Sequence, residues 1–140
     1  MSRVLKFRAW EKISKRMIQP HDGDFIKWHA MSNWKNCLEV MQFTGLTDIK
    51  GVEIYEGDIL ETPYHYRGNY FSGEDEESGL YRGKVHYTPS KGFIQRSVLV
   101  LDDENASGEW ARRGPIDIRS KSARVIGNIY ESPELLKVEG

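Results

Sequence analysis

Cysteine is almost absent from this sequence, because Cys37 is the only one among 140 residues. A single thiol cannot form a disulfide within the chain, which excludes a disulfide-stabilised secreted domain and is typical of a reducing compartment. The chain also lacks an apolar run near the roughly 20 residues that cross a bilayer. Its first ten residues contain no apolar stretch of signal-peptide length. We therefore expect an intracellular, cytoplasmic protein with no membrane partner.

An excess of charge of either sign is missing as well. The sequence has 20 Lys and Arg against 21 Asp and Glu, for a formal net charge of −1. This balance disfavours a strongly basic nucleic-acid-binding protein, although a net charge does not describe how charges are distributed. Charged residues make up 29% and hydrophobic residues 39% of the chain. These values predict one globular domain over residues 1–140.

The common motifs of catalysis and metal binding are missing too. The four histidines, at positions 21, 29, 65 and 86, do not form a His-x-x-x-His pair, and no Cys-x-x-Cys occurs. The chain has no Gly-x-Ser-x-Gly nucleophile motif. It also has no Gly-rich phosphate-binding loop. We therefore assign no catalytic residue, no metal ligand and no cofactor, and we regard an enzyme as the least favoured class of function.

Regularly spaced glycines are the most informative feature that is present. Residues 43–60 contain Gly45, Gly51 and Gly57, six positions apart, and Asp58 follows the last of them. Glycine tolerates positive φ, and Asp hydrogen-bonds to nearby backbone in turns. We interpret these four residues as a structural turn motif that joins short strands. The turn at residues 56–58, followed by two apolar residues, resembles the entry to a strand of a small SH3-like barrel.

Alternation of apolar and polar residues predicts strands along most of the chain. The expected strands are residues 4–10, 17–18, 38–43, 54–55, 58–62, 83–88, 92–101, 116–118 and 123–130. Ser132 followed by Pro133 and Glu134 predicts the start of a short C-terminal helix. We therefore predict a mostly β fold: a small SH3-like β-barrel with an N-terminal β-hairpin, an irregular extension and a short C-terminal helix. Residues 43–140 form the barrel core, with a long loop at about 64–82.

Residues 1–42 combine the hairpin with an aromatic-rich extension. Within the extension, Phe25, Trp28, Met31 and Trp34 follow no clean period, so a helical face and an irregular excursion both stay open. Interfaces favour aromatic residues and Met. These four residues are therefore our candidate protein interface, although they are equally compatible with completing the core.

Three stretches of this chain resemble the YopX family, a group of small, uncharacterised proteins of phages and prophages. They are KFRAW at residues 6–10, TGLTDIKGVEIYEGDIL at 44–60 and VIGNIYESPELL at 125–136. The resemblance implies a mainly β fold with a small barrel, self-association, and a location in the cytoplasm of a bacterial host. It implies no reaction and supplies no catalytic or binding residues.

Our leading functional hypothesis is a non-catalytic accessory protein that self-associates or binds a protein partner. The alternative is a nucleic-acid-binding β-barrel, because small barrels present aromatic and basic side chains to nucleic acid. The candidate nucleic-acid surface consists of Lys6, Arg8, Trp10, Arg112 and Arg113. A contiguous basic face would distinguish this alternative from a protein-binding module.

Overall fold

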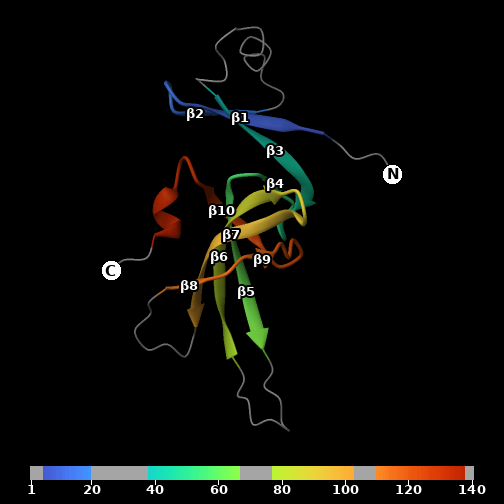
Figure 1. Cartoon of the computed structure of the whole chain (residues 1–140), viewed down its shortest axis with the longest axis vertical. Helices are drawn as coiled ribbons and strands as arrows, with labels where there is room; N and C mark the ends of the chain where they lie inside the picture. The colour runs from blue at the N-terminus through green and yellow to red at the C-terminus, as the bar shows by residue number, and fades with distance from the viewer. Residues whose placement is uncertain (1–4, 20–37, 67–76, 103–109, 138–140) are drawn as a thin grey trace.

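A mostly β fold is confirmed by the computed structural model, which describes residues 5–19, 38–66, 77–102 and 110–137 (Figure 1). Within these residues, the smaller sheet has four strands in the order β2-β1-β3-β4, and the larger has the order β10-β5-β6-β7-β8, with β9 paired to β7. Their bounds are β1 Phe7–Glu11, β2 Arg16–Ile18, β3 Leu38–Thr47, β4 Glu53–Tyr55, β5 Asp58–Tyr66, β6 Glu77–Thr88, β7 Gly92–Asp102, β8 Ala111–Arg113, β9 Ile116–Asp117 and β10 Arg124–Asn128. The larger sheet is curled, and its strands lie below the smaller sheet in the view of Figure 1.

The N-terminal hairpin consists of β1 and β2, which pair antiparallel with Ala9 opposite Ile18. Alternation along β1 sends Ala9 to one face, where it forms a buried cluster with Ile18 and Leu38. The neighbouring residues Arg8 and Trp10 face the opposite side of the strand. The hairpin therefore has two distinct faces, as its alternating sequence predicted.

The main hydrophobic core lies on one face of the larger sheet, which we call the core face. Its fully buried members are Ile54, Leu60, Val85 and Ala123, and the partly buried Phe93, Ile118 and Val125 pack against them. These residues come from both sheets and from the segment before β10. Apolar burial here holds together parts of the chain that are distant in sequence.

A three-way junction forms at the turn between β4 and β5. Gly57 has a φ of +83°. Its N–H donates to Val85 O at 2.9 Å, and its carbonyl accepts from Ile129 N at 2.8 Å. A Cβ at Gly57 would lie 3.1 Å from Met41 Sδ. Glycine is thus required here both for the backbone angle and for the close packing of β3, β6 and the end of β10.

Next to this junction, a buried ion pair connects the two sheets. Asp58 is 1% exposed, and its Oδ1 accepts a hydrogen bond from Arg8 Nη2 at 2.6 Å. Its Oδ2 accepts from Tyr55 N at 2.8 Å, which closes the turn. The Arg8 guanidinium also lies over the Tyr55 ring, 4.6 Å from its centroid. Burial raises the pKa of the Asp58 carboxyl above its usual value, although Arg8 and the Tyr55 N–H favour the ionised form.

The loop between β3 and β4 is organised around the Asp48 carboxylate. Asp48 Oδ1 accepts from Lys50 N and Val52 N at 2.8 and 2.9 Å, and Oδ2 accepts from Val125 N at 3.0 Å. Burial raises the pKa of Asp48, but the three backbone N–H donors outweigh it and lower the pKa below its usual value. Gly51 follows with a φ of +84°. The carboxylate therefore ties this loop to β10.

The loop predicted at about 64–82 is wrong at both ends, because strands occupy the first and the last residues of this range. Strand β5 continues to Tyr66 and β6 begins at Glu77, and the two pair in continuous register. Cross-strand contact explains the difference, because Tyr64 stacks on Tyr81 with ring centroids 4.5 Å apart. Residues 67–76 lie outside the described residues.

The predicted C-terminal helix is a single 3-10 turn, η1, at Pro133–Leu136. Ser132 makes no side-chain capping bond, and the backbone bonds Leu135 N→Ser132 O and Lys137 N→Glu134 O span three residues. Such bonds define a 3-10 turn, which is common in short pieces. The turn packs against β6 and β7 of the larger sheet.

The candidate interface residues Phe25, Trp28, Met31 and Trp34 lie outside the described residues. No helix in the described part of the chain is long and apolar enough to cross a membrane.

We expect Asp58→Asn to lower the free energy of unfolding by about 3–5 kcal/mol, because it leaves the buried Arg8 without its counter-charge. The double variant Arg8→Met with Asp58→Asn removes both charges and should recover part of this loss. Urea unfolding followed by circular dichroism measures both. A double variant as unstable as Asp58→Asn alone would show that the loss of stability does not come from the unpaired charge of Arg8.

Candidate functional site

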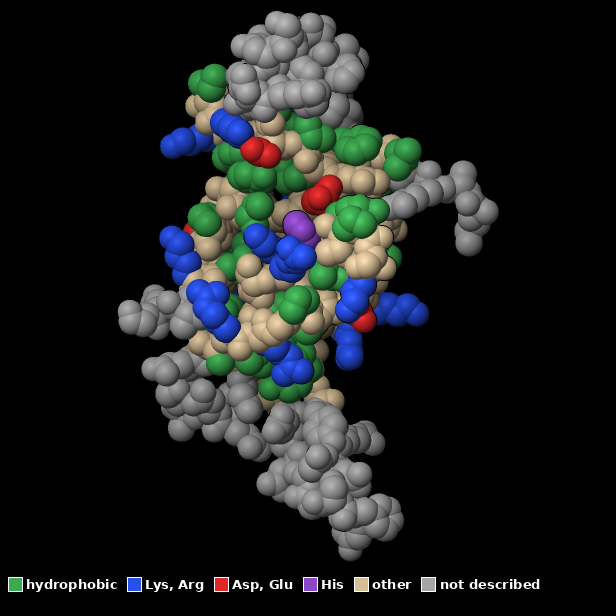
Figure 2. Space-filling model, viewed as in Figure 1, with side chains coloured by type: hydrophobic (Ala, Val, Ile, Leu, Met, Phe, Trp, Pro, Cys, Tyr) green, Lys and Arg blue, Asp and Glu red, His purple; other side chains and the backbone are tan. Residues whose placement is uncertain are grey.

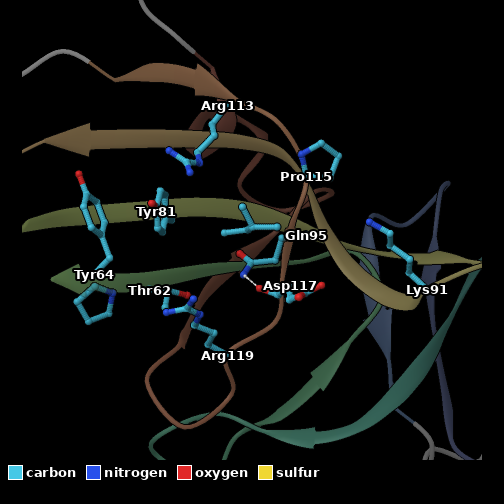
Figure 3. Close-up of a pocket in the computed structure, with 11 residues that line it drawn as sticks. Thr62, Tyr64, Tyr81, Lys91, Gln95, Arg113, Pro115, Asp117 and Arg119 are labelled. Carbon is cyan, nitrogen blue, oxygen red and sulfur yellow. Dashed lines mark hydrogen bonds between the residues drawn. The ribbon is translucent and has the colours of Figure 1, made fainter. Parts of the chain in front are cut away.

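A cavity of about 330 Å³ opens on the core face of the larger sheet, where the apolar core ends. Its walls come from β5, β6, β7, β8, β9 and the segments that flank β9. Figure 3 shows Tyr64 and Tyr81 at one end of the cavity, Lys91 at the opposite end, and Arg113 and Arg119 on two sides between them. A volume of this size is within the range of small-ligand sites.

The floor of the cavity is polar. On β5, alternation places Leu60, Thr62 and Tyr64 on the same face, so Thr62 lies between the core and the cavity. Gln95 is 0% exposed and donates from Nε2 to Asp117 O at 3.1 Å. Within the described residues, Thr62 Oγ1 and Gln95 Oε1 have no hydrogen-bond partner. Buried polar atoms without partners are costly, so a ligand or a water that donates a hydrogen bond to them is favoured here.

A bulge in β7 allows Gln95 to lie flat against the sheet. The pairing of β6 with β7 shifts by one residue between Arg82 and Lys84, and Ser97 on β7 has a φ of +52°. A Cβ at Gly83 would be 3.0 Å from both Cβ and Oε1 of Gln95, and 3.1 Å from Val98 Cγ2. The missing side chain at Gly83 therefore makes room for Gln95. Bulges of this kind often occur next to functional sites.

The aromatic end of the cavity consists of two stacked tyrosines. The rings of Tyr64 and Tyr81 are inclined by 23°, and the Arg113 guanidinium lies 5.2 Å from the Tyr81 centroid. A Cβ at Gly79 would lie 2.8 Å from Tyr64 Cε1, so the glycine lets Tyr64 lie across β6. This arrangement places a flat apolar surface beside a cation.

Three cations and one carboxylate line the cavity: Lys91, Arg113 and Arg119 against Asp117. Local turns position two of the cations. Lys91 N donates to Thr88 Oγ1 at 3.2 Å, and the Arg119 carbonyl accepts from Ser122 N and Ala123 N. In the described part of the chain, none of the three cations forms an ion pair. Their charges are therefore available to an anionic ligand.

Positive charge extends to the opposite side of the larger sheet, which we call the outer face. The pairing register aligns one row across five strands: Arg124, Glu61, Arg82, Leu99 and Arg112. Glu61 accepts from Arg82 Nε at 3.0 Å and from Arg124 Nη2 at 2.9 Å. The Arg82 guanidinium lies 4.4 Å from the Trp110 ring centroid. Lys84 pairs with Arg96 in the next row.

The larger sheet therefore holds most of the basic side chains that the structure describes. Residues 58–66, 77–102 and 110–128, which cover its strands and the turns between them, contain nine Lys and Arg and five Asp and Glu. Figure 2 shows Lys and Arg side chains spread over this part of the molecule, with few acidic ones between them. The near-zero net charge of the whole chain hides this separation.

Comparison with known families decides the identity of the chain. A model of the YopX family, described as YopX protein, matches residues 6–137. The chain belongs to the YopX family. Its structure is similar to the crystal structure of protein EF1440 from Enterococcus faecalis, with 24% sequence identity and a TM-score of 0.52. The match covers 97% of this chain and 100% of that chain, and it supports the fold alone. No curated protein matches the sequence significantly.

In this YopX protein, one of the five residues predicted for a nucleic-acid surface lines the cavity. That residue is Arg113, whereas Arg112 belongs to the outer face, because neighbouring residues of a strand point to opposite sides. Lys6, Arg8 and Trp10 lie on the smaller sheet and are engaged within the protein. Lys6 pairs with Glu53, Arg8 with Asp58, and Trp10 stacks on Tyr130 with centroids 5.5 Å apart.

Sequence reasoning did not find Thr62, Tyr81, Lys91 or Gln95 as members of one site. They come from different strands, and only the pairing of β5, β6 and β7 brings them together. The available signal was modest: Thr62 and Gln95 are polar residues at strand positions that alternation assigns to the core face. Among the described residues, no cluster of His, Cys, Asp and Glu is arranged to hold a metal ion.

We expect Gly83→Ala to lower the free energy of unfolding by about 1–3 kcal/mol, because its Cβ must displace Gln95 and Val98. Gly114→Ala is the matched control, since a Cβ there meets nothing within 4 Å. Urea unfolding of both variants provides the measurement. Equal stability of the two would show that the floor of the cavity is not tightly packed.

Proposed function

We propose that this YopX protein binds nucleic acid through its larger sheet. The observation that carries the proposal is the excess of nine basic over five acidic residues in the strands and turns of that sheet, with aromatic side chains among them. Phosphates supply the dominant and sequence-independent part of nucleic-acid affinity, and Lys and Arg bind them. The aromatic side chains of the sheet, on which unpaired bases can stack, favour a single-stranded ligand.

The outer face offers a row of phosphate-binding groups. Arg124 and Arg82 flank Glu61, which neutralises only part of their charge, and Arg112 lies beyond the buried Leu99. Side-chain exposure of 50% for Arg124 leaves its guanidinium accessible while it contacts Glu61. Trp110, next to Arg82, adds a ring on which a base can stack.

The curled sheet supports the same proposal by analogy. We keep the SH3-like barrel of the sequence analysis as part of this proposal, because small barrels bind single strands with one exposed sheet face and aromatic platforms. We also keep as predictions the phage or prophage origin and the cytoplasmic location that the family resemblance implies. Fold analogy alone does not identify a function, so the charge pattern carries the argument.

Binding of a fluorescein-labelled single-stranded 12-mer, measured by fluorescence anisotropy between 50 and 200 mM salt, tests the proposal. Contacts to three or four phosphates predict a slope of log K against log salt of roughly −2 to −3. Arg112→Gln removes one such contact and should reduce the magnitude of the slope by about 0.7.

Lys12→Gln is the control, because Lys12 lies beyond β1 on the smaller sheet and pairs with Glu39. The same neutralisation there should leave affinity and slope unchanged. The proposal is wrong if the wild type shows no salt-dependent binding, or if Lys12→Gln weakens binding as much as Arg112→Gln does.

A second candidate function, protein binding with self-association, is favoured by the loop between β3 and β4. Leu46 at the end of β3 is 38% exposed, and Ile49 and Val52 are 60% and 48% exposed on the loop that Asp48 fixes. Apolar side chains held on an ordered loop are typical of a contact surface. We infer that a second copy of the chain is the partner. The aromatic segment from Phe25 to Trp34 stays a separate prediction of such a surface.

Light scattering tests self-association. We expect a wild-type mass above that of the 16.2 kDa chain. Ile49→Lys should shift the mass toward the monomer, because it places a charge in the contact. Ile13→Lys is the control, since Ile13 is an equally apolar and 77% exposed residue in the turn between β1 and β2. A monomeric wild type would rule out this candidate.

A further inference from the structure

We infer that the cavity on the core face binds one unpaired nucleotide. Its base lies at the tyrosine end and its phosphate lies between Arg113 and Arg119 (Figure 3). This inference rests on the proposed function and adds a subsite to it: the outer face binds phosphates of the strand, and the cavity takes a single base from it. The ligand of the cavity carries a phosphate ester and a planar ring, and either a single strand or a free nucleotide supplies both.

The size of the cavity suits one nucleotide. Its volume of about 330 Å³ is at the lower end of the range for small-ligand sites. A base within a duplex is stacked on both sides and reaches such a cavity only after it leaves the stack. An unpaired base requires no such step. The cavity therefore favours single strands over duplexes.

The walls at the tyrosine end suit a base. Tyr64 and Tyr81 provide stacked aromatic rings, and Pro63, next to Tyr64 on β5, provides further apolar surface. Stacking on aromatic side chains is the usual way in which proteins hold unpaired bases, and every base has a suitable face. Arg113 beside Tyr81 brings a planar cation next to the same surface.

The two arginines suit the phosphate. Arg113 and Arg119 enter the cavity from different segments, and neither has a carboxylate partner among the described residues. A guanidinium binds phosphate oxygens through two parallel N–H bonds, which fixes orientation as well as charge. Among the described residues of the lining, Asp117 is the one acidic residue against three basic ones, so this part of the site is positive.

The floor adds a preference for hydrogen-bond donors on the ligand. Because Gln95 Nε2 donates to Asp117 O, the amide orientation is fixed and Oε1 is the unpaired acceptor. Thr62 Oγ1 lies in the same floor and also has no partner among the described residues. A ligand N–H or O–H that reaches these atoms relieves the cost of burying them.

Two neighbouring arginines allow a matched pair of variants to test the inference. Arg113 lines the cavity and Arg112 lies on the outer face, so Arg113→Gln and Arg112→Gln remove the same charge from opposite sides of one strand. Anisotropy of a labelled single-stranded 12-mer is measured for both, together with competition by AMP and by ribose 5-phosphate. A 12-mer of abasic residues, which has phosphates but no bases, is the second probe. Circular dichroism verifies that both variants are folded.

We expect Arg113→Gln to weaken binding of the 12-mer at least ~10-fold, because it removes one phosphate contact and with it the binding of one stacked base. AMP should compete for the wild type and for Arg112→Gln but not for Arg113→Gln, and ribose 5-phosphate should compete more weakly than AMP. The abasic 12-mer should bind wild type and Arg113→Gln within about twofold of each other, because without a base it does not occupy the cavity.

The remaining outcomes separate this inference from the proposed function. Equal binding of the abasic and normal strands by the wild type, with no competition by AMP, overturns the nucleotide subsite and leaves strand binding in place. AMP binding that depends on Arg113, without any strand binding, overturns the proposed function and identifies the cavity as a site for a free nucleotide. Absence of both overturns both.

Discussion

The structure depends on the ion pair between Arg8 and Asp58, which connects the smaller sheet to the first residue of β5. Both residues are nearly inaccessible, at 8% and 1% exposed. Burying two charges is costly, and their attraction compensates only when the geometry is specific. Here Asp58 also closes the turn through Tyr55 N, and the adjacent Gly57 bonds to β6 and to the residue after β10. Displacing one side chain would therefore disturb the turn, the sheet contact and the start of the strand that leads into the cavity.

Much of the fold follows from short-range patterns. Alternation in residues 6–10 predicted β1, and the glycines at 45, 51 and 57 all have positive φ in turns or strand ends. The same alternation placed Lys6, Arg8 and Trp10 on one face. It did not indicate that this face packs inward against Glu53, Asp58 and Tyr130. A period of two identifies the two faces of a strand, but the choice of the buried face is made by residues far away in the sequence, 47 and 50 positions for Lys6 and Arg8.

The cavity was less predictable than the fold for the same reason. Tyr64 and Tyr81 were separated by a glycine-rich, acidic stretch that hid the strand pairing between them. Gln95 reaches its position only because β7 carries an extra residue at its bulge and Gly83 lacks a side chain. No local pattern encodes a bulge opposite a glycine. The segregation of charge was likewise hidden, because the acidic residues of the whole chain balance the basic residues of one sheet.

Strand β8 is a three-residue strand at the edge of the larger sheet, and its residues point to both faces of that sheet. Arg112 and Arg113 are neighbours in this strand, so one short piece of backbone carries an arginine on each face of the sheet. A ligand that orders either face therefore lowers the conformational entropy that the second must still lose. Binding at the two proposed sites would then be positively linked through the backbone of β8.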